Sequence, residues 1–243
     1  MHLNERGRGG QYYYASPLST RGKIERRSSR ANEKTDLRIA REGIIYITLP
    51  AVAAAILALL GQWWFALIFV VVLLFMIYFF RDPEREPPAD QDVIVSPADG
   101  RVTRVDRLAP DQVDSPTLVS IFLSPLDVHV NRAPIAGRIT DVSYTRGKFL
   151  MATDERASLV NEQNAVTIEG SGLVVVCKQI AGILARRIVC WKHENDEVAL
   201  GERFGLIKFS SRTDLILPEN VTVLVGAGDR VKGGSSIIGR IQR

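Results

Sequence analysis

The longest apolar stretch of the chain, residues 43–80, contains no charged side chain over 38 positions. As one straight helix it would extend about 57 Å, roughly twice the ~30 Å thickness of a bilayer's hydrocarbon core. Gly61–Trp64 places a helix breaker and an amide beside two aromatic rings that suit a membrane interface. The pattern therefore predicts a helical hairpin with legs Ile44–Leu60 and Phe65–Phe80, spanning or re-entrant in a membrane. A buried hairpin within a larger core is the alternative.

A charged, proline-rich segment, 81–92, follows the apolar run and predicts a short stiff linker. Beyond it, residues 93–243 contain short β-branched runs separated by Gly, Pro and Asp, and only Ala152–Gln163 resembles a helix. We expect a mostly β (α+β) protein with an antiparallel, sandwich-like domain. The ten strands expected are Val93–Val95, Val102–Val105, Leu118–Phe122, Ile139–Tyr144, Ala165–Ile168, Leu173–Ile180, Arg187–Trp191, Leu206–Phe209, Leu215–Leu217 and Val221–Val225. Neither a βαβ pattern nor a glycine-rich phosphate loop occurs, which excludes Rossmann and P-loop chemistry.

The charge is unevenly distributed along the chain. Residues 1–42 carry ten Lys/Arg against five Asp/Glu, whereas residues 81–243 carry 21 against 22. A nucleic-acid-binding domain with a basic face is therefore unexpected. Residues 1–42 lack hydrophobic periodicity and predict a disordered basic arm whose arginines can contact anionic lipid. Arginines on both sides of the apolar run predict that its two ends lie on the cytoplasmic side (Arg38, Arg41, Arg81).

The two cysteines, Cys177 and Cys190, have no metal-ligand spacing and lie in apolar, strand-like runs. Buried free thiols are expected, with no metal site. Of the three histidines, His193 lies in a polar turn, where a solvated side chain is expected. His129 differs, because it lies in a polar cluster that follows an apolar strand.

Several weak signals gain weight from their order. The blocks are Phe79–Pro83, Ser96–Gly100, Leu123–His129, Asn161–Asn164, Gln179–Gly182, Ala185–Ile188 and Phe204–Arg212. Their order resembles that of phosphatidylserine decarboxylase proenzymes, most closely the short bacterial form with a single hairpin. The resemblance extends from Ile44 to about Leu217.

The resemblance implies an enzyme that cuts itself at a Gly-Ser bond and turns the serine into a pyruvoyl cofactor. By position the cut lies between Ser210 and Ser211, giving chains 1–210 and 211–243. The pyruvoyl carbonyl forms a Schiff base with the amine of phosphatidylserine and accepts the electrons released by decarboxylation, giving phosphatidylethanolamine. The resemblance therefore implies a substrate in the bilayer and a cell-membrane location on the cytoplasmic face. It also implies a heterodimer of the two chains and, optionally, a homo-oligomer.

The resemblance also suggests roles for individual residues. Asp99 matches the acid of the cleavage relay, and His129 matches a base for cleavage, a proton donor in decarboxylation, or both. The chain departs from the long bacterial enzymes at Arg132, where they have a second histidine. It departs again at Ser210, where the family usually has glycine, and a serine forced to positive φ there would cost about 1 kcal/mol or more.

Residue type alone suggests that Lys148 and Phe149 contact the phosphate and acyl region of the substrate. Gly233–Ser236 also offers a Gly-Ser bond, for which a turn between strands is the better interpretation. Two other functions stay open from the sequence. One is an uncleaved, membrane-anchored binding module of lipoyl-like shape. The other is a hydrolase that uses Ser211, His129 and Asp99 as a triad, although no nucleophile elbow is present.

Overall fold

The computed structural model describes residues 38–90, 92–112, 115–154, 156–183, 187–209 and 211–242. The chain divides into two units, Met1–Lys34 and Thr35–Arg243, and all described residues belong to the second. Most of the basic arm expected for residues 1–42, together with Ser210, lies outside the described residues.

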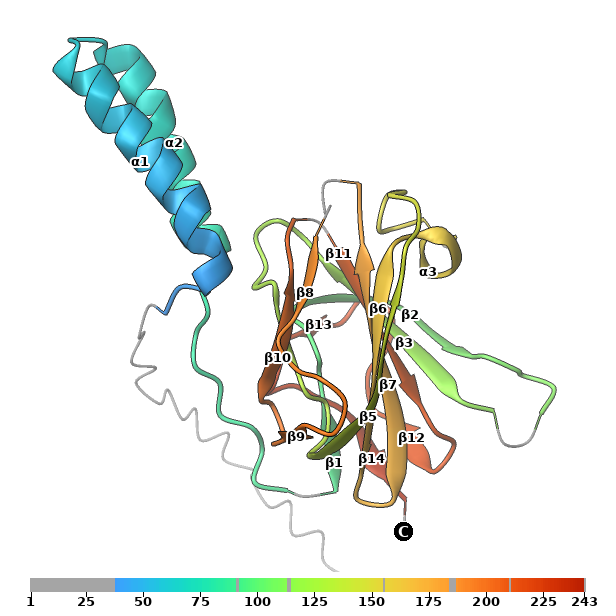
Figure 1. The fold of residues 1–243 in the computed structure, drawn as a ribbon. Helices are drawn as coiled ribbons and strands as arrows, with labels where there is room; N and C mark the ends of the chain where they lie inside the picture. Colours follow the sequence, from blue (N-terminus) through green and yellow to red (C-terminus); the bar gives the residue numbers. More distant parts are fainter. Residues whose placement is uncertain are drawn as a thin grey trace, which may run out of the picture. The chain divides into compact units, whose positions relative to one another are not determined.

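Two apolar helices open the described part. A short 3-10 turn, Arg41–Gly43, leads into α1 (Ile44–Leu59), and α2 (Trp63–Phe79) runs back beside it (Figure 1). The turn lies at Leu60–Gln62, where Gly61 has a φ of 73°, a conformation that only glycine adopts readily. The hairpin is thus confirmed, but Trp63 and Trp64 begin the second leg and do not form the turn.

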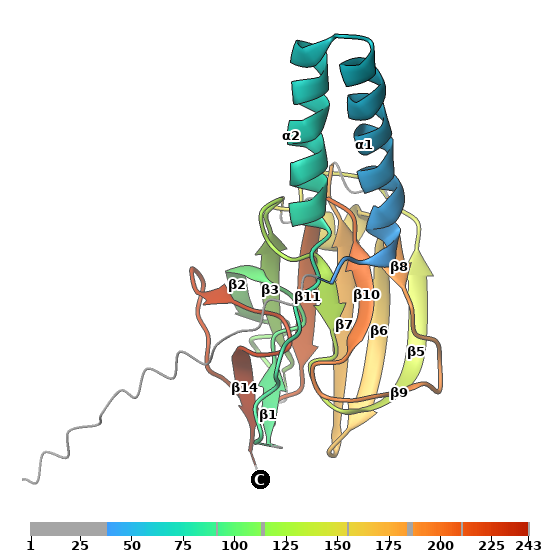
Figure 2. The ribbon, with the colours of Figure 1, turned by 90° about the vertical axis from the view of Figure 1, so that its left-hand side faces the viewer.

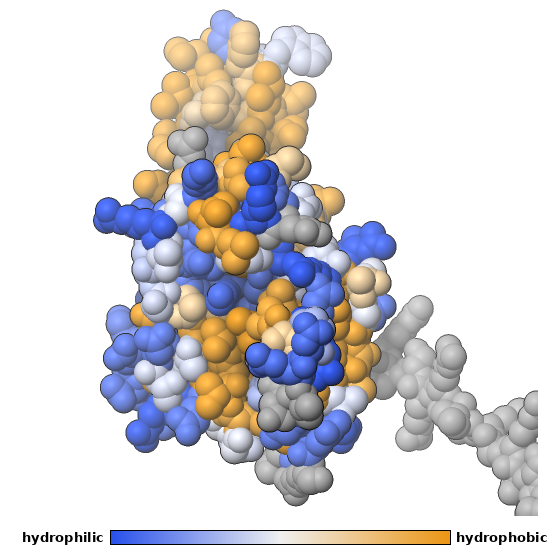
Figure 3. All heavy atoms as spheres, turned by 90° about the vertical axis from the view of Figure 1, so that its right-hand side faces the viewer, coloured by the Kyte–Doolittle hydropathy of each residue, from blue (hydrophilic) through white to orange (hydrophobic). Residues whose placement is uncertain are grey.

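The helix pair exposes its apolar side chains over most of its length. Leu59, Trp64 and Leu74 are 88%, 83% and 60% exposed, and Figure 3 shows the upper, helical part coloured mostly as hydrophobic. Arg41–Leu59 is long and apolar enough to cross a membrane, and Trp63–Phe79 is shorter. The exposed faces argue against the alternative of a hairpin buried in a protein core.

Antiparallel strands make up the rest of the described chain. They are β1 (Val93–Val95), β2 (Gly100–Arg107), β3 (Thr117–Leu123), β4 (Val130–Arg132), β5 (Gly137–Thr145), β6 (Gln163–Gly170), β7 (Leu173–Ala181), β8 (Ile188–Cys190), β9 (Glu197–Val198), β10 (Arg203–Ile207), β11 (Ser211–Leu217), β12 (Val221–Val223), β13 (Arg230–Val231) and β14 (Ile237–Ile241). An eight-stranded sheet has the order β13-β2-β3-β11-β7-β6-β5-β9. Two three-stranded sheets have the orders β1-β14-β12 and β4-β10-β8.

The three sheets share one apolar core, which gives the domain its sandwich-like character. Alternate residues of the large sheet, such as Ile121, Val175 and Leu215, pack with Ile94 and Phe204 of the two small sheets. Figure 2 shows β10 and β8 in front of β7 and β6, as this packing requires. The expected α+β fold with mainly antiparallel strands is confirmed.

Two elements differ in length from the expected ones, a helix that is shorter and a strand that is longer. The helix expected over Ala152–Gln163 is the single turn α3 (Ala157–Val160). It stops because Asn161 is extended and its side-chain amide bonds the backbone of Leu150 and Ala181. Strand β11 begins at Ser211, four residues before the expected Leu215, because its polar residues are buried and paired.

Candidate active site

The expected cleavage position lies where the chain crosses between two sheets. Strand β10, which ends at Ile207, belongs to a small sheet, and β11, which begins at Ser211, lies in the centre of the large one. Ser211 is the first residue of β11 and pairs with Leu123 on β3 and Ala181 on β7. Strand pairing on both sides therefore fixes the backbone of Ser211.

The Ser211 side chain is fully buried, and its Oγ has no hydrogen-bond partner among the described residues. Leaving a buried hydroxyl unpaired costs about 1–3 kcal/mol, so natural proteins rarely do so without a function for the group. A serine selected only for packing would find a partner or be replaced by alanine. The orphaned hydroxyl is available as a nucleophile.

His129 directly precedes β4 and is also fully buried. Its Nδ1 lies 2.9 Å from the carbonyl oxygen of Asp127, and its Nε2 has no partner among the described residues. Since a carbonyl oxygen only accepts, Nδ1 carries the proton and Nε2 holds the free lone pair. Burial lowers the pKa of His129 to about 4, against the opposing effect of the Asp127 carbonyl. At neutral pH this imidazole is an uncharged base.

The backbone brings His129 close to the crossover. Ile207 at the end of β10 donates its N–H to the His129 carbonyl at 3.2 Å. On the other side of the crossover, Ser211 pairs with Leu123, and the turn Ser124–Asp127 leads from there to His129. That turn is closed by the Asp127 carboxylate, which accepts from the backbone N–H and hydroxyl of Ser124 at 2.8 and 2.7 Å.

Phe79, the last residue of α2, contributes a buried ring to this region. It lies 4.3 Å from the His129 ring and stacks on Phe209 with ring centroids 4.7 Å apart. Phe209 precedes Ser210 and has a φ of 65°, which is rare for a bulky residue and costs about 1 kcal/mol or more. The described backbone strain thus lies one residue before the position at which the sequence led us to expect it.

Asp99 lies in the turn between β1 and β2 and bonds to other groups than His129. Its carboxylate accepts from Arg85 Nη2 at 3.0 Å and from the Gly233 N–H at 2.7 Å. Burial raises the pKa of Asp99, and the Arg85 guanidinium opposes that shift. Asp99 and His129 interact electrostatically with the same two neighbours, Asp127 and Arg81, and no described hydrogen bond joins them directly.

Arg132, at the departure from the long bacterial enzymes, binds the segment that leaves the hairpin. It bonds Asp82 Oδ1 at 3.1 Å and the Pro83 carbonyl at 2.8 Å, while Arg203 reaches Asp82 Oδ2 at 2.6 Å. Burial and the nearby Arg203 lower the pKa of Arg132 to about 10, so it stays charged at neutral pH. We call this group of Asp82, Arg132 and Arg203 the Asp82 clamp.

The two residues suggested for substrate contact differ in their surroundings. Lys148 is exposed on the loop after β5, and its backbone bonds to Val160 and Glu162. Phe149 is half-buried against Ala181 and Ile207, which places it next to the strand positions that flank the crossover.

A buried polar network supports the site from behind. Gln179 donates to Asn131 at 2.9 Å and accepts from Asn164 at 3.0 Å, and Asn131 donates to Thr213 at 3.0 Å. These bonds tie β4, β6, β7 and β11 together two residues from both His129 and Ser211. A second buried pair, Arg212 with Asp214, bonds at 2.6 Å. Since their side chains satisfy one another, these residues have structural roles.

The remaining candidates lie outside the site, and Cys190 is less buried than expected. Cys177 is buried, and burial raises the pKa of its thiol; Cys190 is half-buried and also free. His193 has an 86% exposed side chain, and Gly233–Ser236 forms a turn. Within the described ranges, no group of His, Cys, Asp and Glu is arranged to hold a metal ion.

Sequence reasoning missed Phe79, Asp127 and the residues of the Asp82 clamp as parts of the site. Phe79 and Asp82 fall in one of the blocks that carried the resemblance, which was the available signal. Asp127 acts through its backbone carbonyl, and no residue pattern reports such a role.

Comparisons with known proteins agree with the resemblance. The model of the family described as phosphatidylserine decarboxylase matches residues 72–239. The phosphatidylserine decarboxylase proenzyme of Solibacter usitatus is 50% identical over 204 residues, covering 84% of this chain and 97% of that protein. The proenzyme of the same name from Chlorobium phaeobacteroides is 52% identical over 166 residues, covering 68% and 78%. That of Syntrophus aciditrophicus is 43% identical over 210 residues, covering 85% and 99%.

Proposed function

The chain belongs to the phosphatidylserine decarboxylase family and is a decarboxylase, and from this premise we propose that it converts phosphatidylserine to phosphatidylethanolamine with a pyruvoyl group made from its own Ser211. The observation that carries the proposal is a pair of buried atoms that no other described residue bonds, Ser211 Oγ and His129 Nε2. One is a nucleophile and the other an uncharged base.

The residues present fit such a group. Ser211 is at a strand terminus, fully buried, with a free hydroxyl to react. A pyruvoyl carbonyl supplies the electron sink that decarboxylation of an amino acid requires and that ordinary side chains lack. The paired backbone on both sides would hold residue 211 in place before and after maturation.

Self-cleavage uses only groups of this chain and water. His129 Nε2 takes the Ser211 hydroxyl proton while Oγ attacks the carbonyl carbon of residue 210. The C–N bond between 210 and 211 breaks, an ester forms, and the nitrogen of Ser211 takes up a proton. His129 Nε2 then takes the Cα proton of residue 211, the bond from Cβ to the ester oxygen breaks, and residue 210 leaves as a carboxylate with dehydroalanine at 211. Water hydrolyses it to the pyruvoyl group and ammonia.

His129 serves in both stages in this proposal. After cleavage the same neutral, buried imidazole can hold and return a proton at the decarboxylated carbon. Asp99 contributes as a positioning residue, because Arg85 and Gly233 hold its carboxylate on the turn that borders β4. With His129 in both stages, the relay needs no second histidine. Arg132, at the position of that second histidine, binds Asp82 in the clamp.

The two chains are proposed to stay together as a heterodimer. Residues 211–243 supply β11, β12, β13 and β14, and all four pair with neighbouring strands. Of these, β11 is bonded on both sides in the centre of the large sheet, to β3 and to β7. Cutting one peptide bond before β11 leaves all these pairings intact.

The hairpin gives the enzyme access to a lipid substrate. We place it in the cell membrane with both ends on the cytoplasmic side, since arginines flank it and its apolar faces are exposed. The acyl chains then remain in the bilayer while the headgroup is bound at its surface. Phe149, and Lys148 beside it, are proposed to contact the substrate; unchanged activity of Lys148→Ala on vesicles would remove that lysine from the site.

Intact mass of the detergent-purified protein tests the proposal. We expect one chain ending at residue 210 and one whose mass equals residues 212–243 plus a pyruvoyl cap, which phenylhydrazine labels. Phosphatidylserine vesicles should yield phosphatidylethanolamine. Ser211→Ala should remain a single chain without activity, and Ser210→Gly should cut at least as fast as the natural sequence. An uncut chain that decarboxylates, or a cut chain that does not, contradicts the mechanism.

A further inference from the structure

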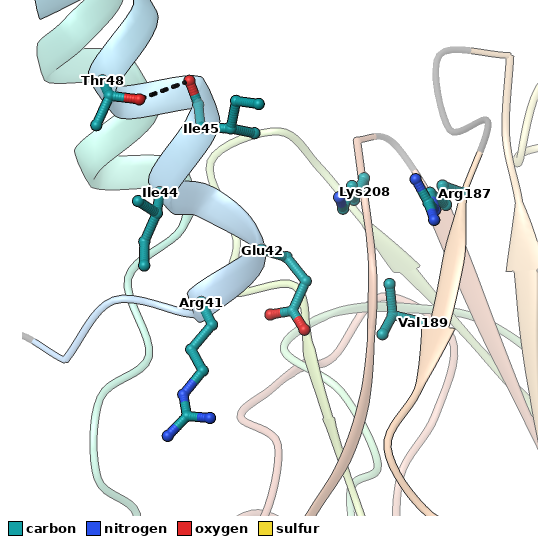
Figure 4. A pocket seen from close by; sticks show the side chains of 8 residues that line it. All are labelled: Arg41, Glu42, Ile44, Ile45, Thr48, Arg187, Val189 and Lys208. Atoms are coloured by element: carbon teal, nitrogen blue, oxygen red, sulfur yellow. Dashed lines mark hydrogen bonds between the residues drawn. The ribbon is translucent and has the colours of Figure 1, made fainter.

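A cavity lies between the start of α1 and the strands that lead to the crossover (Figure 4). Its volume is about 660 Å³, within the usual range for small-ligand sites. The lining residues are Arg41, Glu42, Ile44, Ile45, Thr48, Arg187, Val189 and Lys208. None of the steps proposed above uses these side chains.

One part of the lining is cationic. Figure 4 shows Arg187 and Lys208 next to each other, whereas Arg41 extends away from them. Lys208 is only 8% exposed, and among the described residues it has no carboxylate partner. Its Nζ lies 5.0 Å from the centre of the Tyr46 ring, which holds the ammonium but does not neutralise it. The buried Lys208 ammonium and the exposed Arg187 guanidinium beside it suit a phosphodiester.

Another part of the lining is the Glu42 carboxylate, of which only one oxygen accepts a hydrogen bond from a described residue. Glu42 Oε1 accepts from Trp191 Nε1 at 2.7 Å, while the buried Oε2 has no donor among the described residues. Figure 4 shows the Glu42 side chain extending from the helix start toward Val189. A buried carboxylate oxygen without a donor is costly, and an ammonium group would satisfy it.

The remaining lining is apolar and continues onto the helix surface. Ile44 and Ile45 are 56% and 60% exposed at the point where the apolar hairpin begins. A ligand with acyl chains can lie along α1 while its polar head enters the cavity.

We propose that this cavity binds the headgroup of an aminophospholipid, with its phosphodiester at Arg187 and Lys208 and its ammonium at Glu42. The inference rests on the proposed function, since both the substrate phosphatidylserine and the product phosphatidylethanolamine have this chemistry. The amine of a lipid held at Glu42 is not at residue 211. The cavity is therefore a staging position between the bilayer and the reaction site, three residues along the chain from Lys208.

The test is lipid binding by the uncleavable Ser211→Ala chain, measured by native mass spectrometry in detergent. The probes are phosphatidylserine, phosphatidylethanolamine, phosphatidylglycerol and phosphatidylcholine with identical acyl chains. Only the first two have ammonium N–H donors. We expect them to bind about tenfold or more tightly than the other two, the size of one charged hydrogen bond.

Single substitutions separate the two halves of the cavity. Glu42→Gln keeps an acceptor for Trp191 and should remove the preference for the two amino lipids. Arg187→Gln should weaken all four lipids about fivefold, because all four have the phosphodiester. Arg138→Gln, on the exposed edge of β5, is the matched control and should change nothing. Equal binding of phosphatidylethanolamine and phosphatidylcholine, or unchanged selectivity in Glu42→Gln, overturns the proposal.

The relative affinities of the two amino lipids identify the source. Tighter phosphatidylserine assigns the cavity to incoming substrate, and tighter phosphatidylethanolamine assigns it to departing product. Since the Ser211→Ala chain performs no chemistry, selective binding would stand even if the natural chain proved unable to cut itself. If the Ser211→Ala chain bound all four lipids equally while the natural chain decarboxylated normally, this site alone would be overturned.

Discussion

At the scale of single residues, the site depends on two buried polar atoms that have no partner in the part of the chain that the structure describes. The Asp127 carbonyl fixes the tautomer of His129, so its free nitrogen is the one that can accept a proton. Burial then keeps that imidazole uncharged well below neutral pH. A backbone carbonyl therefore performs the orienting task that a carboxylate performs in a serine triad.

This geometry predicts a pH profile. The pKa of His129 falls from 6.5 in the unfolded chain to about 4 in the folded one, so the unfolded state binds more protons between these values. The stability contributed by neutral His129 is complete above pH 6.5 and is lost as the pH falls toward 4. Self-cleavage of freshly translated protein should be independent of pH from 8 to about 5. A loss of rate centred near 6.5 would contradict the buried, uncharged base.

The ring of Phe79 predicts a second effect. Phe79→Leu removes the aromatic contact with His129 and Phe209, which should lower stability by about 1–2 kcal/mol and slow cleavage about tenfold. The acid limb of the pH profile should also move toward 6.5 as water reaches the imidazole. Phe75→Leu is the control, because Phe75 lies one turn earlier and is 36% exposed. Equal cleavage rates for the two variants would remove Phe79 from the site.

The sequence was sufficient to nominate Ser211, His129 and Asp99, because each lies in a block with a family resemblance. It was insufficient to show what each one contacts. Asp99 bonds Arg85 and Gly233, which are 14 and 134 positions away, and no local pattern reports such distances. The roles of these three residues in catalysis remain predictions.

At the scale of secondary-structure elements, the segment after α2 connects the hairpin to the β domain and also bonds to two of its strands. In the Asp82 clamp, one buried carboxylate is shared by two arginines, one on β4 and one on β10. These two strands pair in one small sheet; His129 directly precedes β4, and β10 leads into the crossover, so the clamp joins the end of the hairpin to the side of the site that carries His129.

Replacing this carboxylate should be costly. Asp82→Asn leaves two guanidinium groups, one of them almost fully buried, without a counter-charge, and should destabilise the protein by about 3 kcal/mol. Denaturant unfolding in detergent measures the change. Glu197→Gln breaks the exposed pair with Arg138 and should cost no more than about 0.5 kcal/mol. Equal losses of unfolding free energy in the two variants would show that the Asp82 clamp stabilises the protein no more than an exposed ion pair does.

Apolar runs located most elements, and the strands that they did not locate are two or three residues long or, in β14, interrupted by Gly239 and Arg240. The hairpin legs and most expected strands were correct to within a few residues. The pattern missed β4, β9, β13 and β14, and it started β11 late. Asn131, Arg212 and Asp214 are buried and each bonds a residue more than fifty positions away, so their polarity is no guide to exposure.

At the scale of the whole second unit, hairpin and β domain share an apolar cluster. Phe79 and Phe80 pack with Val128, Val130 and Leu206 from strands β4 and β10 and the turn before them. The hairpin is therefore part of the folded enzyme as well as its proposed anchor.

A truncated chain tests this unity. Residues 81–243 alone would expose the apolar side chains of β4 and β10 and lose the ring over His129, so we expect aggregation or an uncut chain in a mass measurement. A full-length variant with polar replacements at Leu67, Val71 and Leu74, which are 54%, 59% and 60% exposed, should still cut itself. Cleavage of the truncated chain at the natural rate would show that the hairpin serves only as an anchor.

The Asp82 clamp also limits where the enzyme can act. It holds the end of α2 against the strands around the crossover, so the reaction site lies at a fixed, short reach from the point where the chain leaves the hairpin. With the hairpin inserted from the cytoplasm as proposed, only lipid in the adjacent leaflet can present its headgroup. Phosphatidylserine in the opposite leaflet must first flip across the bilayer, so the rate of flipping would govern how evenly the product is shared between the two leaflets.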